Sequence, residues 1–242
     1  VFVVGHDRGA IIAWFLCMFR PDKAKALVNL SVPFIPRNLC SKPVECLRAM
    51  LVYSLSMNMT AIRLRATKCF KHRRRNLGYV ADAEIARLGT RTFQKKVFTY
   101  HKPEPLYKPE EGWGSRNEKI TLSFWLSEED IDYYASTFEK TGFTGPLNYY
   151  RCLDSWEFAA PWSGAEINVP TKFIIGDEDL THHFPGMHLY LNFCALRMFV
   201  PGLQDVVIMK GVGHFLNQER AGEITEYIYN FSKQYPRNAA DS

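Results

Sequence analysis

The sequence predicts an α/β fold in which a parallel sheet is interrupted by a long insertion. Two observations carry this prediction. Short β-branched and aromatic runs, typical of buried parallel strands, alternate with apolar stretches that have the length of helices. The second and third of these runs are separated by residues 32–170, far more than a loop between neighbouring elements needs. We therefore expect one α/β core with a subdomain inserted between its strands.

The predicted core elements follow one another along the chain. A strand at 1–4 leads into a helix at 10–19, and further strands are expected at 26–31, 171–175 and 205–209. The helix at 10–19 is apolar on nearly all sides, which predicts burial beneath the sheet.

Two helices outside these elements carry clear end signals. One is expected at 128–140, with Ser127 as N-cap, Asp130 in the capping-box position and Gly142 beyond its end. The other is expected at 221–234, and its apolar face consists of Ile224, Ile228 and Phe231. The first of these helices indicates that the insertion is mainly helical.

Composition excludes several classes of protein. Of the 242 residues, 47% are apolar and 23% are charged, close to the average of globular proteins, so the chain is neither disordered nor fibrous. The most apolar stretch, 9–19, ends at Arg20 before it reaches the about 20 residues of a membrane span. The six cysteines include no CxxC pair and no spacing to histidine that suits a metal. We expect no membrane span, no metal, and thiols kept reduced in the cytoplasm or the peroxisome.

The net charge of +5 is concentrated in one segment. No Asp or Glu occurs between Glu45 and Asp82, whereas seven basic residues lie close together there: Arg63, Arg65, Lys68, Lys71, Arg73, Arg74 and Arg75. Such a run can bind nucleic acid, but no aromatic or helical motif accompanies it. We expect a solvated loop and no nucleic-acid partner.

Three of the predicted strands are followed by polar motifs. After the first strand, GHDRG has the form of a nucleophile elbow with Asp7 in the nucleophile position. GDED follows the third strand and GVGH the fourth, ending in His214. The order nucleophile, acid, histidine is that of the α/β-hydrolase triad. Spacing alone leaves both Asp177 and Asp179 open as the acid.

These motifs, together with NYYR at 148–151, resemble those of plant soluble epoxide hydrolases in the α/β-hydrolase superfamily. The resemblance extends over 1–33, 124–162, 169–180 and 206–219. It implies an α/β-hydrolase fold and the hydrolysis of lipophilic epoxides, such as fatty-acid epoxides, to vicinal diols. It also implies that the partners are the small epoxide and water, with no cofactor, and it gives no oligomeric state.

The resemblance assigns roles to individual residues. Asp7 is expected to attack the epoxide and form an ester, and His214 to activate the water that hydrolyses this ester. Asp179, the second aspartate of GDEDL, is expected to orient His214. Tyr150 matches one of two tyrosines that polarise the epoxide oxygen, and Tyr53 is the candidate for the other.

The resemblance also implies the domain boundaries. The core is expected at 1–37 and 167–236, the helical lid at 38–166 with an atypical basic segment at 51–82, and a tail at 237–242.

The chain departs from the family pattern in two ways. Arg8 replaces a tryptophan; its backbone N–H is still expected to serve the oxyanion hole, but its guanidinium is expected to pair with Asp7 and weaken the nucleophile. The family's first strands and its His-Gly-x-Pro loop would precede Val1, so we expect the C-terminal part of the sheet, with an open apolar edge. A catalytically impaired relative therefore stays an alternative. Haloalkane dehalogenase, which shares the aspartate and histidine, is a second, although NYYR favours epoxides.

Overall fold

The computed structural model describes residues 1–37, 77–102, 114–151, 158–184, 186–192 and 195–236. The chain divides into two compact units. The core unit consists of 1–38, 101–103 and 160–242, and the helical unit consists of 39–100 and 104–159.

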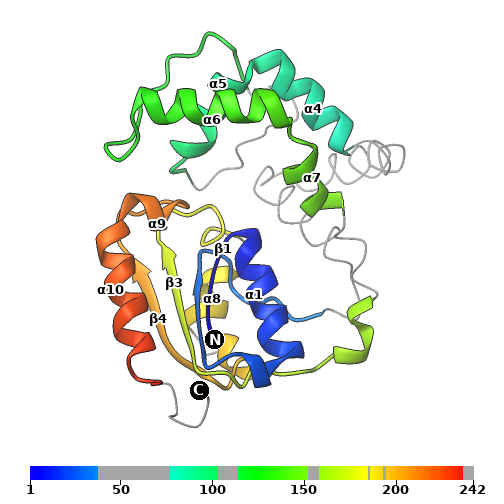
Figure 1. The fold of residues 1–242 in the computed structure, drawn as a ribbon, viewed down its shortest axis with the longest axis vertical. Helices are drawn as coiled ribbons and strands as arrows, with labels where there is room; N and C mark the ends of the chain where they lie inside the picture. The colour runs from blue at the N-terminus through cyan, green and yellow to red at the C-terminus, as the bar shows by residue number, and fades with distance from the viewer. Residues whose placement is uncertain (38–76, 103–113, 152–157, 185, 193–194, 237–242) are drawn as a thin grey trace. The chain divides into compact units, whose positions relative to one another are not determined.

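The core unit is built on a parallel sheet of four strands in the described part of the chain (Figure 1). The strands lie side by side in chain order: β1 (Phe2–His6), β2 (Ala26–Leu30), β3 (Thr171–Gly176) and β4 (Leu203–Met209). All three pairings are parallel. The predicted α/β class is confirmed, and each predicted strand is present with its ends shifted by no more than two residues.

The register brings the carboxyl ends of the four strands to one edge of the sheet. His6 pairs with Leu30, Leu30 with Ile174, and Gly176 with Met209. The residues that follow these positions therefore meet at one place although they are far apart in sequence. In open parallel sheets this edge is where ligands bind.

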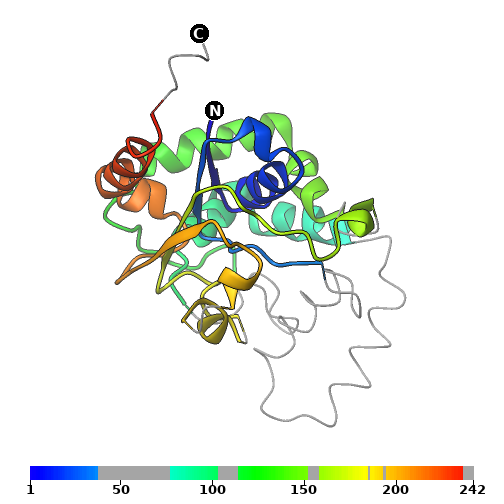
Figure 2. The ribbon, with the colours of Figure 1, turned by 90° about the horizontal axis from the view of Figure 1, so that it is seen from below.

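Helices cover both faces of the sheet (Figures 1 and 2). On one face, α1 (Arg8–Phe19) and α8 (Met187–Asn192) enclose a core that contains Trp14 and Phe173. On the other face, α9 (Leu216–Glu219) and α10 (Ala221–Ser232) pack on the sheet through Leu216, Ile224 and Phe231. Burying a large apolar side chain contributes about 1.5–3 kcal/mol, so these two layers hold the strand ends in place.

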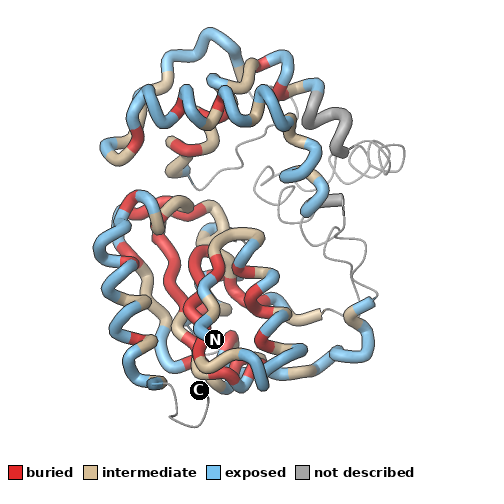
Figure 3. Tube along the Cα trace, in the orientation of Figure 1, coloured by how far each residue is buried: buried red, intermediate tan, exposed pale blue. Residues whose placement is uncertain are grey.

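Only one side of α1 is buried in the described structure, contrary to the prediction of burial on nearly all sides. Trp14 is 1% exposed, whereas Ile12 is 53% exposed and Phe19 is 39% exposed. Figure 3 shows buried and exposed stretches alternating along α1. The other side of α1 is exposed because the helix packs beside β1, which pairs only with β2 among the described residues. Phe2 and Val4 of β1 are exposed in the described part of the chain.

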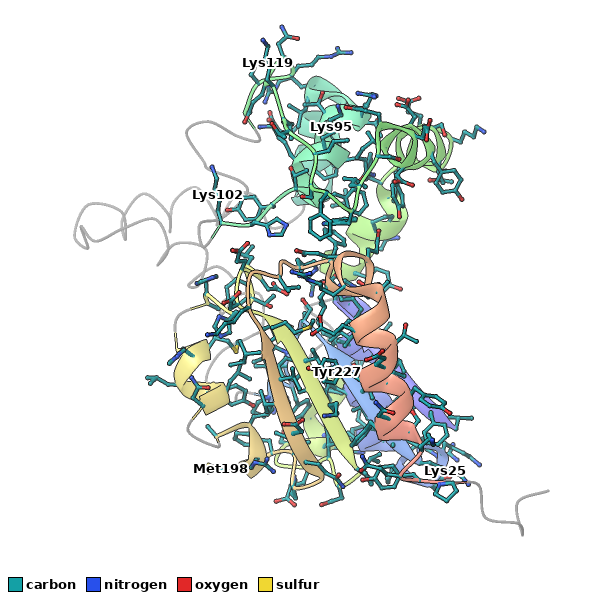
Figure 4. All side chains as sticks on the ribbon, turned by 90° about the vertical axis from the view of Figure 1, so that its left-hand side faces the viewer. Lys25, Lys95, Lys102, Lys119, Met198 and Tyr227 are labelled. Atoms are coloured by element: carbon teal, nitrogen blue, oxygen red, sulfur yellow. The ribbon has the colours of Figure 1, made fainter. Side chains whose placement is uncertain are left out.

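The helical unit contains α4 (Leu77–Leu88), α5 (Thr90–Phe98), α6 (Glu128–Thr141) and α7 (Thr144–Arg151). The predicted capping box of α6 is confirmed: Ser127 Oγ accepts the N–H of Asp130, whose carboxylate accepts the N–H of Ser127. Ion pairs join α5 to α6, including one of 2.5 Å between Lys95 and Glu128 (Figure 4 labels Lys95). No helix in the described ranges is both long and apolar enough to span a membrane.

Candidate active site

Asp7 lies at a sharp turn between β1 and α1. Its backbone is in the left-handed region, with φ of 51°, which is uncommon for a residue other than glycine. A Cβ on Gly5 would lie 2.5 Å from the amide oxygen of Asn29 and 2.8 Å from the Cα of Ala10, so only glycine lets the turn close. A Cβ on Gly9 would meet no described atom within 4 Å, so of the two flanking glycines only Gly5 is required by packing. This is the strained strand-to-helix geometry of a nucleophile elbow.

The loop after β3 brings one of its two aspartates to the histidine. Asp179 is fully buried, and both of its carboxylate oxygens lie 3.1 Å from His214 Nδ1. Asp177 instead accepts the backbone N–H of Gly211 at 2.7 Å. The geometry thus places Asp179 beside His214, as the resemblance implied, and gives Asp177 a bond to the neighbouring loop.

The loop after β4 places His214 between Asp179 and Asp7. A Cβ on Gly176 would collide with the carbonyl oxygen of Val212, so this glycine allows the histidine loop to lie directly against the end of β3. His214 Nε2 lies 3.6 Å from Asp7 Oδ1. The imidazole therefore presents one nitrogen to each carboxylate.

Two polar residues that the sequence analysis did not single out support His214. His6 Nε2 donates to the His214 carbonyl at 2.8 Å, and the two rings are 5.0 Å apart. Ser31 follows β2 directly, and its hydroxyl contacts both Asp179 and His214 Nδ1. The sequence could have indicated Ser31 as a site residue, because it is a polar residue at the carboxyl end of a predicted strand.

Burial and charge determine the protonation of these groups. For Asp179, burial opposes ionisation, but hydrogen bonds from His214 and Ser31 outweigh it and lower the pKa of the carboxyl group. For His214, burial lowers the pKa, but the hydrogen bond and charge of Asp179 and the charge of Asp7 raise it overall. The nearby charge of Arg8 acts in the opposite direction and favours neutral His214. Burial is also the main cause of the lowered pKa of His6.

Because of these pKa shifts, the contribution of the Asp179–His214 pair to the free energy of unfolding depends on pH. The lowered pKa of Asp179 contributes stability that is lost when the pH falls through its folded-state value. The raised pKa of His214 contributes stability that is lost when the pH rises through its folded-state value. The pair is therefore most stabilising between these two limits.

The remaining predicted site residues are only partly described. Tyr150 lies in α7, but its side chain is outside the described part, and Tyr53 lies outside it altogether. Arg8 begins α1, where backbone N–H groups have no acceptor within the helix. Its use as an oxyanion donor and its effect on Asp7 stay predictions. Within the described ranges, no group of three or more His, Cys, Asp or Glu residues is suited to a metal ion.

The arrangement combines three chemical capacities in a small space. Asp7 is a partly exposed carboxylate on a strained turn, His214 is a base in contact with it, and Asp179 is a buried acceptor behind the base. A carboxylate can displace a leaving oxygen from an electrophilic carbon, and an imidazole can remove a proton from water.

Known proteins with similar sequences share one activity in their names. No protein-family model matches the chain. Epoxide hydrolase 1 from Siraitia grosvenorii is 47% identical over 236 residues, which cover 97% of this chain and 70% of that protein. Epoxide hydrolase A from Mycobacterium tuberculosis is 31% identical, over 94% of this chain and 67% of that protein. The chain belongs to the epoxide hydrolase family.

Solved structures of epoxide hydrolases agree with this assignment. Potato (Solanum tuberosum) epoxide hydrolase I is 45% identical and superposes with a TM-score of 0.81, over 97% of this chain and 70% of that one. An epoxide hydrolase from Vigna radiata is 41% identical, with a TM-score of 0.79 and 69% of its chain covered. The resemblance to plant epoxide hydrolases and the α/β-hydrolase fold are confirmed.

We predict that Asp179→Asn lowers the pKa of His214, whereas Asp177→Asn leaves it raised. The reason is that, of these two aspartates, only Asp179 places a charge within hydrogen-bond distance of the ring. NMR titration of the His214 ring protons in both variants measures this. Equal pKa values in the two variants would show that Asp179 does not control the histidine.

Proposed function

We propose that this chain hydrolyses epoxides to vicinal diols through an ester formed on Asp7. The observation that carries the proposal is the contact of His214 Nε2 with Asp7 Oδ1, at 3.6 Å on a strained elbow, in a member of the epoxide hydrolase family. An ester formed at Asp7 would lie within reach of a base that can activate water.

The first half of the reaction forms the ester. The ionised Asp7 carboxylate attacks one epoxide carbon, a carbon–oxygen bond forms, and the bond from that carbon to the ring oxygen breaks. The ring oxygen takes up the electron pair as an alkoxide and is protonated by a donor on the opposite side. We assign this proton to the hydroxyl of Tyr150, with Tyr53 as the candidate second donor.

The second half clears the ester. His214 Nε2 removes a proton from water, and the resulting hydroxide attacks the ester carbonyl carbon of Asp7. The negative charge of Asp179 stabilises the imidazolium. The carbonyl–oxygen bond of the ester then breaks, the diol leaves with an oxygen that came from Asp7, and the carboxylate retains the oxygen of water. The leaving diol oxygen takes the proton of the added hydroxide. The proton on His214 balances the one that Tyr150 gave up, so its return to Tyr150 through solvent restores both side chains.

We further infer the substrate class and the cellular location of this chain. Resemblance to plant soluble enzymes supports a lipophilic epoxide of the fatty-acid type as the substrate, and it supports a helical lid at 38–166. The lack of a disulfide pattern among the six cysteines supports a cytoplasmic location, and Cys17 is a buried free thiol in the described part of the chain. We also propose that the chain has no nucleic-acid partner. Most of the basic segment at 51–82 lies outside the described residues. The names of the relatives favour epoxides over the haloalkane alternative.

We predict that His214→Gln forms the ester but does not hydrolyse it. Intact-protein mass spectrometry after mixing with styrene oxide should show stable addition of one epoxide mass, and Asp7→Asn in the same background should abolish it. Turnover by the unmodified chain without any adduct in His214→Gln would contradict the assigned order of steps.

We also predict that Tyr150→Phe slows ester formation by about 10-fold or more, because a general acid is lost while the ring is kept. Tyr149→Phe, at the neighbouring half-exposed position in α7, is the matched control and should retain the rate. Rapid-mixing measurement of adduct formation compares the two variants. Loss of the rate in Tyr149→Phe alone would reverse the assignment.

A further inference from the structure

Ser31 has an unusual backbone for a serine. It lies directly after β2, is fully buried, and has φ of 74°, in the left-handed region that favours glycine. Its N–H donates to the carbonyl of Ile174, and its own carbonyl accepts the hydroxyl of Thr181, both at 2.8 Å. Bonds on both sides therefore hold this residue in a costly conformation. Such strain persists where the surroundings fix it and is concentrated at functional sites.

The Ser31 side chain gives a reason for a serine at this position. Its hydroxyl donates a hydrogen bond to Asp179 Oδ2, and its oxygen lies 2.8 Å from His214 Nδ1. That distance is shorter than the 3.1 Å from Nδ1 to the Asp179 carboxylate. Glycine would adopt the backbone more easily but would remove both contacts.

The positions of the protons follow from these contacts. Ionised Asp179 can only accept hydrogen bonds, so the single Ser31 proton points to Asp179 and the Ser31 oxygen presents a lone pair to His214. An unprotonated Nδ1 would then face the Ser31 oxygen and the Asp179 carboxylate without a proton between them. The consistent arrangement has a proton on Nδ1, shared between Ser31 and Asp179, and leaves Nε2 unprotonated toward Asp7.

We infer that Ser31 is a positioning residue that fixes the Nδ1–H tautomer of His214 for water activation. The inference rests on the proposed function for its kinetic consequence. Ester formation uses Asp7 and needs no base, whereas ester hydrolysis needs the free Nε2 lone pair. Loss of the Ser31 hydroxyl therefore slows the second step and spares the first.

Two variants separate the hydroxyl from the backbone strain. Ser31→Gly removes the hydroxyl and accommodates the positive φ, whereas Ser31→Ala removes the hydroxyl and keeps the strain. Thr171→Val is the matched control, because Thr171 is equally buried in the same sheet and its hydroxyl bonds, among the described residues, only the carbonyl of Val169. Thermal melting of each variant reports its stability separately from its kinetics.

The experiment is a single-turnover reaction with styrene oxide, followed across pH. We expect ester hydrolysis to slow about 10-fold in both Ser31 variants, as for loss of a partner from a buried charged network, with an altered pH dependence. Ester formation should stay within about 2-fold of the unmodified chain, as should both steps in Thr171→Val. Unchanged hydrolysis in both Ser31 variants, or slowing in Ser31→Ala alone, overturns the inference.

A second measurement keeps the test independent of the reaction. Nitrogen NMR of His214 at a pH above its pKa distinguishes the two ring tautomers, and we expect the Nδ1–H form in the unmodified chain and a mixture in Ser31→Gly. If no ester forms in the unmodified chain, the proposed function fails, and the tautomer still decides the role of Ser31. A His214 tautomer that is the same with and without the hydroxyl overturns the inference in that case.

Discussion

The site depends on the fully buried carboxylate of Asp179 and on the hydrogen bonds that this carboxylate accepts. An ionised group away from water is costly unless hydrogen bonds satisfy its oxygens. Here the N–H of Thr181 donates to Oδ1 at 2.8 Å, Ser31 donates to Oδ2, and His214 Nδ1 lies 3.1 Å from both oxygens. These partners come from the end of β2 and from the loops after β3 and β4. The hydrogen bonds to this one carboxylate therefore hold three segments of the core in place relative to one another.

The sheet makes this convergence possible. Parallel strands in the order β1 to β4 end at one edge, so the residues that directly follow the strands lie close together. Close backbone approach then completes the geometry: Gly5 lets α1 lie against β1, and Gly176 lets the histidine loop lie against β3. Strain is confined to Asp7 and Ser31, the two described residues other than glycine with positive φ. Both lie at the site, one as the proposed nucleophile and one behind the proposed base.

Much of this fold is readable from local sequence, because each signal acts over a few residues. Short β-branched and aromatic runs predict the strands, and the spacing of Ser127 and Asp130 predicts the capping box of α6. The extent of burial around α1 does not, because it depends on which elements pack against the helix rather than on its own apolar residues. Ser31 shows the same limit in the site: a serine after a strand is ordinary, and its role arises from contacts with Asp179, 148 residues later. Spacing could not separate Asp177 from Asp179, since the difference lies in which loop atom each one bonds.

Every later step of the proposed reaction depends on attack of the epoxide by Asp7 and not by water. The most direct test is a single turnover in oxygen-18 water with the protein in excess over styrene oxide, followed by mass analysis of the diol and of the peptide that contains Asp7. We expect heavy oxygen in the Asp7 carboxylate and none in the diol, because the diol takes its oxygen from the carboxylate and water restores it. Heavy oxygen in the diol with an unlabelled Asp7 would show that water attacks the epoxide directly.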